Sequence, residues 1–163
     1  MPAKLSSFEI LTMAEQIERD GAEFYQKAAQ KLNDDELQNL FFQLAEWEKR
    51  HEQIFAEMKK QLLEKHDTSM RFDEANYITS NPQQLFSLAK SAIHDDPEEQ
   101  LSKIHNKLEA LKLVLARENE TVKFFRSLES HLRDLVAKKK VREVIEEEKK
   151  HINIITQAIE QIT

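Results

Sequence analysis

The chain has 163 residues, of which one is glycine, three are proline and none is cysteine. So few turn-forming residues argue against β sandwiches, β barrels and α/β folds, and they favour an all-α protein. Without cysteine there is no disulfide, thiolate zinc site or cysteine-ligated iron centre, so a metal must be bound by His, Asp or Glu. The formal net charge of −6 gives no electrostatic reason to expect a nucleic acid or an anionic membrane as partner.

Two long helices are predicted in the first part of the chain, over residues 6–31 and 35–65, with a turn between them. In both segments apolar residues recur at alternating steps of three and four. This spacing is typical of a helix that packs lengthwise against others in a bundle. Because the turn is short, we expect the two helices to lie antiparallel and to form a hairpin over about 6–65.

The next segment, about 66–105, is too long for a tight turn and begins with a polar stretch. We expect it to be a crossover with two short helical pieces, near 83–93 and 97–105. Each piece would begin beside a proline, which fits the first turn of a helix.

A second hairpin is predicted over about 106–162, with the third long helix beginning around Asn106. This hairpin repeats the first at an offset of 100 residues, because 12 of 59 positions are identical when 5–63 is compared with 105–163. Two short-loop hairpins joined by one long crossover define the ferritin-like topology. We therefore predict one domain, residues 1–163, with an all-α ferritin-like four-helix bundle. A plain up-and-down bundle would leave the crossover unexplained.

Six polar residues lie on the otherwise apolar seams of the four long helices. They are called the Glu/His cluster below, and they are Glu18, Glu48, His51, Glu118, Glu148 and His151. Each hairpin supplies a Glu from its first helix and a Glu-x-x-His from its second. The midpoint between the two Glu of each hairpin falls at position 33 or 133, where the turn is predicted, so both carboxylates should lie at one height.

Buried carboxylates repel one another and must be protonated, paired or bound to cations. Two divalent ions would cancel the charge of the four carboxylates in the Glu/His cluster. Carboxylates with one imidazole per ion suit iron or manganese, whereas structural zinc sites prefer thiolates and more imidazoles. The sequence therefore predicts two ions of iron or manganese, for which zinc could substitute.

The sequence resembles the ferritin-like di-iron carboxylate proteins, and among them the rubrerythrin-related branch. The resemblance covers four motifs, which are ERDGAEFY at 18–25, EKRH at 48–51, ENETVKFF at 118–125 and EKKH at 148–151. It implies that the Glu/His cluster provides the ligands of two irons. It also implies that Tyr25 hydrogen-bonds a ligand carboxylate or supplies an electron, the alternative being a core aromatic whose hydroxyl finds any local acceptor.

Two departures from that resemblance bear on function. Full-length rubrerythrins carry a further carboxylate at the position of Thr121, and they carry a cysteine-ligated rubredoxin domain that feeds electrons to the di-iron centre. This sequence has threonine there and no cysteine. We therefore expect a rubrerythrin-like bundle alone, which depends on an external electron donor protein.

Three residues outside the cluster invite interpretation. Trp47, beside Glu48, is expected to serve in packing, and Glu147 is expected to belong to a solvated helix face together with its neighbour Glu146. Gly21, the one glycine, lies one turn from Glu18. It either leaves room for solvent or a small oxidant, or it allows close helix packing.

The resulting hypothesis is a di-iron oxidoreductase of the peroxidase or oxidase type, whose centre reacts with hydrogen peroxide or dioxygen. The alternatives are a ferroxidase or iron-storage protein and a non-enzymatic helical module with a structural metal. The N-terminus lacks the pattern of a secretory signal, and no apolar run is long enough to cross a membrane. We therefore expect a cytoplasmic protein. As a separate expectation, the protein forms a homodimer.

Overall fold

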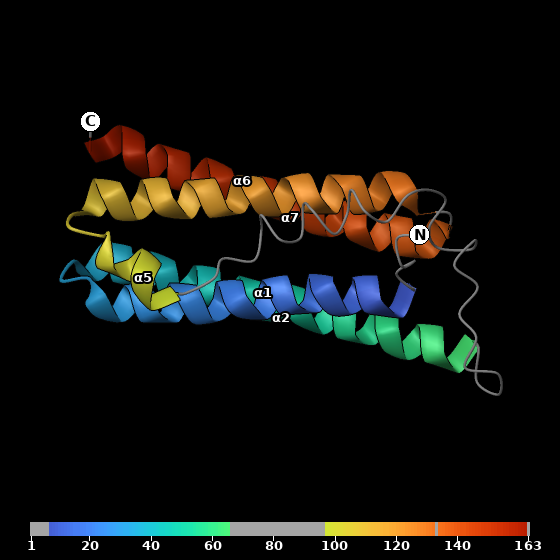
Figure 1. Ribbon diagram of the computed structural model, residues 1–163. Coiled ribbons are helices and arrows are strands. Elements are labelled where there is room, and N and C mark those ends of the chain that lie inside the picture. The colour runs from blue at the N-terminus through green and yellow to red at the C-terminus, as the bar shows by residue number, and fades with distance from the viewer. Residues whose placement is uncertain (1–6, 66–96, 133, 163) are drawn as a thin grey trace, which may run out of the picture.

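The structure is a computed structural model, and it describes residues 7–65, 97–132 and 134–162. Within these ranges the chain forms two antiparallel helical hairpins, as predicted, and a short helix between them (Figure 1). The helices are α1 (Ser7–Lys31), α2 (Asp35–Lys65), α5 (Pro97–Ser102), α6 (Lys107–His131) and α7 (Leu135–Ile162). None of these helices has the length and apolar character needed to span a bilayer.

The direction of the helices accounts for the long crossover. Figure 1 shows that α2 ends at one end of the bundle, whereas α5 and the start of α6 lie at the other. The end of α2 and the start of α5 are therefore separated along the bundle by more than a tight turn can span. The helix expected near 83–93 lies outside the described residues.

The short helix expected at 97–105 is present as α5, but it ends at Ser102. The reason is that the amides of Lys103 and Ile104 bond to carbonyls only three residues back, so the last turn tightens and stops. The chain then enters α6 through Asn106, whose side chain accepts a hydrogen bond from the amide of Glu109. Asn106 is thus the N-cap of the third long helix rather than its first residue.

Equivalent aspartates start the second helix of each hairpin. Asp34 Oδ1 accepts a hydrogen bond of 2.9 Å from the amide of Leu37. Asp134 Oδ1 accepts one of 2.9 Å from the amide of Ala137. Both are N-caps, and their separation of 100 residues extends the internal repeat from the helix faces to the turns.

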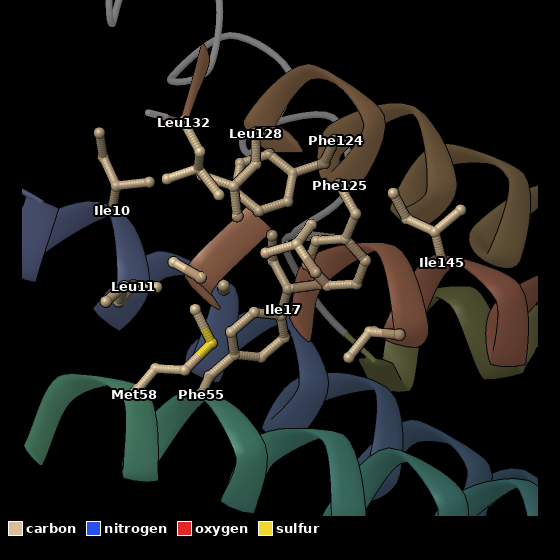
Figure 2. Close-up of a cluster of buried hydrophobic side chains, with 14 of the residues drawn as sticks. Ile10, Leu11, Ile17, Phe55, Met58, Phe124, Phe125, Leu128, Leu132 and Ile145 are labelled. Atoms are coloured by element: carbon tan, nitrogen blue, oxygen red, sulfur yellow. The ribbon is translucent and has the colours of Figure 1, made fainter. Parts of the chain in front are cut away.

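The hydrophobic core is divided into two clusters. The first contains residues from the N-terminal half of α1, the C-terminal half of α2, and the parts of α6 and α7 beside their connection (Figure 2). Within it the rings of Phe55 and Phe125 are in tilted contact, with centroids 5.2 Å apart. The second lies toward the opposite end and includes Phe24, Phe41 and Leu111. The Glu/His cluster lies on the same four helices between these two apolar clusters.

Helices approach one another most closely within each hairpin. Backbone contacts are frequent between α1 and α2 and between α6 and α7, but few between the two hairpins. Large side chains therefore fill the space between the hairpins, and this space is where the polar residues of the cluster meet.

We expect Asp134→Ala to lower the free energy of unfolding by about 0.5–2 kcal/mol, because it leaves an amide at the start of α7 without its cap. Urea denaturation of the metal-free protein measures this change. Asp134→Asn should retain nearly all of the stability, since its side-chain oxygen can accept the same bond. Equal losses in both variants would contradict the capping role.

Candidate metal centre

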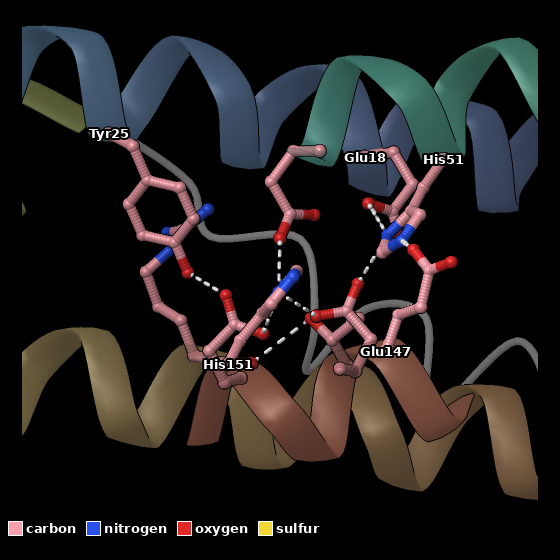
Figure 3. Close-up of polar contacts among 10 residues, drawn as sticks. Glu18, Tyr25, His51, Glu147 and His151 are labelled. Atoms are coloured by element: carbon pink, nitrogen blue, oxygen red, sulfur yellow. Dashed lines mark hydrogen bonds and ion pairs between the residues drawn. The ribbon is translucent and has the colours of Figure 1, made fainter. Parts of the chain in front are cut away.

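All six residues of the Glu/His cluster are buried, and their donor atoms lie close together. Figure 3 labels three of them, Glu18, His51 and His151. None of them is more than 3% exposed. They come from the four long helices, one Glu from α1, one Glu from α6, and a Glu-x-x-His pair from α2 and from α7. The carboxylates that the turn positions placed at one height are therefore close together in the structure, and the two histidines lie beside them.

His51 directs one ring nitrogen into the cluster. Its Nδ1 lies 2.8 Å from Glu148 Oε1, across the hairpin boundary, and 3.5 Å from Glu18 Oε2 on α1. The ring is completely buried.

His151 has the corresponding position in the second hairpin. Its Nδ1 lies 3.1 Å from Glu148 Oε2 and 3.6 Å from Glu48 Oε1. A third carboxylate, that of Glu118, lies 3.8 Å away. Each histidine is thus surrounded by carboxylates from both hairpins.

The donor atoms form two overlapping sets of four. Glu18, Glu48, His51 and Glu148 make one set, and Glu48, Glu118, Glu148 and His151 make the other. Within each set the donor atoms lie within 4.8 Å of one another. Glu48 and Glu148 belong to both sets, whereas each of the other four residues belongs to one.

The cluster has hydrogen-bond acceptors that protein groups leave unused. Among the described residues, both carboxylate oxygens of Glu18, Oε1 of Glu48 and Oε2 of Glu118 are buried without a hydrogen-bond partner. An unpartnered buried carboxylate is strongly unfavourable. Cations would supply the missing partners, so these residues fit a pair of divalent metal ions.

The metal-free cluster holds protons strongly. Burial, followed by the charges of Glu48 and Glu148, raises the pKa of Glu18 well above its ordinary value. The pKa of Glu148 is also raised, by burial and by Glu118. Protons thus partly replace the cations that the carboxylates would otherwise attract.

The two histidines show the opposite balance between burial and charge. Burial lowers the pKa of His51, but the hydrogen bond and charge of Glu148 outweigh it and raise the value to about 10. For His151, burial likewise lowers the pKa, while the adjacent carboxylates of Glu118, Glu148 and Glu48 raise it to about 12. Both rings are therefore cationic in the metal-free protein at neutral pH.

Tyr25 contacts the cluster from α1. Its buried hydroxyl donates a hydrogen bond to Glu118 Oε1, so it holds a carboxylate of the other hairpin. Burial and the charge of Glu118 raise the pKa of this tyrosine well above its ordinary value, which keeps the hydroxyl protonated as a donor.

Thr121 and Gly21 border the cluster. The Thr121 hydroxyl donates a hydrogen bond of 3.0 Å to the Arg117 carbonyl of its own helix. A Cβ at Gly21 would lie 3.5 Å from Glu48 Oε2, which is ordinary van der Waals contact. The glycine therefore lies against a carboxylate that belongs to both donor sets, and a methyl group would fit there.

Two contacts of the cluster were not foreseen from the sequence. Glu147 was expected on a solvated face, but its Oε2 lies 2.7 Å from Nε2 of the buried His51. Trp47 does serve in packing, and its partner is the imidazole ring of His151. The one available signal was the repeat, which makes Trp47 and Glu147 equivalent positions, but it does not reveal that each reaches the opposite hairpin.

Comparisons with known proteins agree with this geometry. The family model for rubrerythrin matches residues 9–159. Among solved structures, a Thermotoga maritima protein described as a ferritin-like diiron-carboxylate protein is similar, with a TM-score of 0.72 and 23% identity over 100% of both chains. This likeness confirms the predicted ferritin-like fold. A search of curated proteins finds no significant match.

The stability of the metal-free protein should fall as pH rises from 5 to 9. The raised pKa values of Glu18, Glu148, His51 and His151 mean that the folded state binds more protons than the unfolded state above the ordinary glutamate pKa. The histidine contribution is complete below an unfolded pKa of about 6.5 and is lost as pH rises through the folded values. Thermal unfolding of chelator-treated protein at several pH values tests this expectation.

The metal-loaded protein is the control for this pH series. Metal binding displaces the protons from the ligands, so the decline in Tm between pH 5 and 9 should disappear or reverse. A metal-free protein whose Tm increases over this range would contradict the proton assignment.

Replacing Glu18 by methionine should stabilise the metal-free protein by roughly 1–3 kcal/mol, because it removes a buried carboxylate that lacks hydrogen-bond partners. The same variant should bind less metal. Urea denaturation and elemental analysis measure the two effects. Glu15→Met, on the same helix but outside the cluster, should leave metal content unchanged. A Glu18→Met variant that is less stable without metal would show that the buried carboxylate does not destabilise the metal-free protein.

Proposed function

The chain belongs to the rubrerythrin family, and we propose that its Glu/His cluster binds two iron ions whose ferrous forms are oxidised by hydrogen peroxide or dioxygen. The observation that carries this proposal is the pair of overlapping four-residue sets that share Glu48 and Glu148. Family membership together with the buried cluster supports iron binding.

In this proposal each ion has its own Glu and His, and the two ions share two carboxylates. Glu18 and His51 serve one ion, and Glu118 and His151 serve the other. Iron held by these residues would supply redox chemistry, since two ferrous ions would provide the two electrons that hydrogen peroxide and two protons need to form two water molecules.

The protein residues would hold the reacting centre in a defined and dry environment. The two apolar clusters close the bundle on either side of the Glu/His cluster and limit the access of water. The hydrogen bond from Tyr25 orients the Glu118 carboxylate. The absence of a side chain at Gly21 leaves space beside Glu48, one of the two shared carboxylates.

Turnover requires a supply of electrons after the irons have been oxidised. The 163 residues contain no cysteine, so they cannot build a cysteine-ligated iron centre of their own. We therefore propose that an external protein donates the electrons. The cytoplasmic location and the homodimer stay predictions.

The proposal is tested by loading the chelator-treated protein with ferrous iron under anaerobic conditions and then adding hydrogen peroxide. We expect about two irons per chain and the appearance of diferric near-ultraviolet absorption on oxidation. His51→Ala should lose iron because it removes a nitrogen donor, whereas His105→Ala, at an exposed position, is the matched control and should retain it.

Each other outcome points to a different function. Two bound irons that give no absorption change with peroxide or dioxygen would exclude the redox proposal and favour a structural metal. Equal iron content in the His51→Ala variant and the wild type would refute the ligand assignment. Light scattering that finds a hollow shell of many subunits would favour iron storage instead.

A further inference from the structure

The residue that precedes each Glu-x-x-His motif differs between the two hairpins. It is Trp47 in α2 and Glu147 in α7, at positions that the 100-residue repeat makes equivalent. The pattern of burial is identical over 41–50 and 141–150, so Trp47 and Glu147 occupy matching positions on their helices and are both partly buried. Each contacts the histidine of the opposite hairpin, which makes them a pair of equivalent positions with unlike chemistry.

Glu147 contacts the outer nitrogen of His51. Its Oε2 lies 2.7 Å from His51 Nε2, while Nδ1 of the same ring lies 2.8 Å from Glu148. Figure 3 shows the carboxylate of Glu147 beside the ring of His51. Because Nε2–H donates to Glu147, the lone pair of a neutral ring is on Nδ1, where the cluster can use it for a metal.

Because Glu147 is partly exposed, its carboxylate loses little solvation when it contacts His51. The side chain is 39% exposed, whereas its partner His51 has no exposed surface. Water therefore solvates one side of the carboxylate, and the other side fixes a buried ring. A typical surface ion pair joins two mobile side chains and contributes little, but here one partner is held rigidly by the core.

Trp47 contacts His151 in a different way. The indole and imidazole rings are stacked, with centroids 4.6 Å apart and planes 11° from parallel. Indole has only an N–H donor, so it offers a ring nitrogen no acceptor and brings no charge. Within the described residues, the carboxylate contacts of His151 all involve Nδ1. The orientation of His151 is thus fixed by ring packing instead of by a second carboxylate.

We propose that this difference makes the two metal positions unequal, with Glu147 as a positioning residue that strengthens metal binding at the position formed with Glu18 and His51. The inference rests on the proposed function, because it assumes that both four-residue sets bind a metal ion. Glu147 adds a negative charge near that position and holds the ring in the binding orientation. Trp47 holds the other ring without adding charge, so that position binds metal more weakly.

The inference is tested by titrating chelator-treated protein with cobalt(II), whose visible absorption reports on the coordination of each ion. The wild type should bind two ions in two separate steps. Glu147→Ala should weaken the tighter step by about 10- to 100-fold and leave the weaker step unchanged. Glu147→Gln should restore part of the affinity, because its amide oxygen can accept the same hydrogen bond from Nε2–H.

Glu146→Ala is the matched control for this titration. Glu146 is the neighbouring exposed carboxylate on α7, and it pairs with Lys149 at 2.9 Å, outside the cluster. The variant loses the same charge without touching His51, so both binding steps should stay as in the wild type. Trp47→Phe keeps a flat ring beside His151 and should affect only the weaker step.

Proton NMR of the cobalt-loaded protein gives a readout that a general loss of stability would not produce. The paramagnetic ion shifts the ring N–H signal of a coordinated histidine. In the wild type the His51 signal should exchange slowly with water because Glu147 holds the proton. In Glu147→Ala that signal should broaden or disappear, while the His151 signal persists.

The outcomes separate this inference from the proposed function. A wild type that binds no cobalt would contradict the metal site itself. Two bound ions whose affinities respond equally to Glu147→Ala, or do not respond at all, would overturn only the inequality of the two positions. An equal effect of Glu146→Ala would attribute the result to overall charge and would also overturn the positioning role.

Discussion

The compensation of buried negative charge is the constraint on which the rest of this structure depends. Four glutamates meet inside the bundle, and several of their oxygens have no hydrogen-bond partner among the described residues. Protons on the histidines and on the carboxylates of raised pKa offset part of the repulsion. Replacing such a layer with apolar residues would stabilise most bundles, so its presence indicates a function that needs cations. The apolar clusters on both sides supply the stability that the polar layer lacks.

Both hairpins contribute residues to each donor set of the cluster. Short turns capped by Asp34 and Asp134 set the height of the residues along each hairpin. Neither hairpin contains a complete set of donors, because each set draws residues from both. Glu148 illustrates the dependence, since its two oxygens contact histidines on different hairpins. Docking of the hairpins and assembly of the cluster are therefore one event, and metal binding should favour the docked state.

The sequence predicted most of the fold and the membership of the cluster, for identifiable reasons. Seam spacing selects which residues of a helix are buried, and a short turn fixes their relative height, so local information was sufficient for Glu18, Glu48 and their repeats. The roles of Trp47 and Glu147 depend instead on how one hairpin is rotated against the other. That rotation results from packing across the interface, which periodicity within a helix does not describe. The early end of α5 has a different cause, because it depends on local hydrogen bonds from Lys103 and Ile104 to the carbonyls of Gln100 and Leu101.

The pairing of Trp47 with Glu147 also bears on how such a protein can change over time. Two separate copies of one hairpin, assembled as a symmetric dimer, would carry the same residue at both places, and any substitution would appear twice. Once both hairpins lie in a single chain, each place can mutate alone. The unlike neighbours of His51 and His151 are a difference that only the joined chain can acquire. A chain that carries both hairpins can therefore differ at the two places, as this one does.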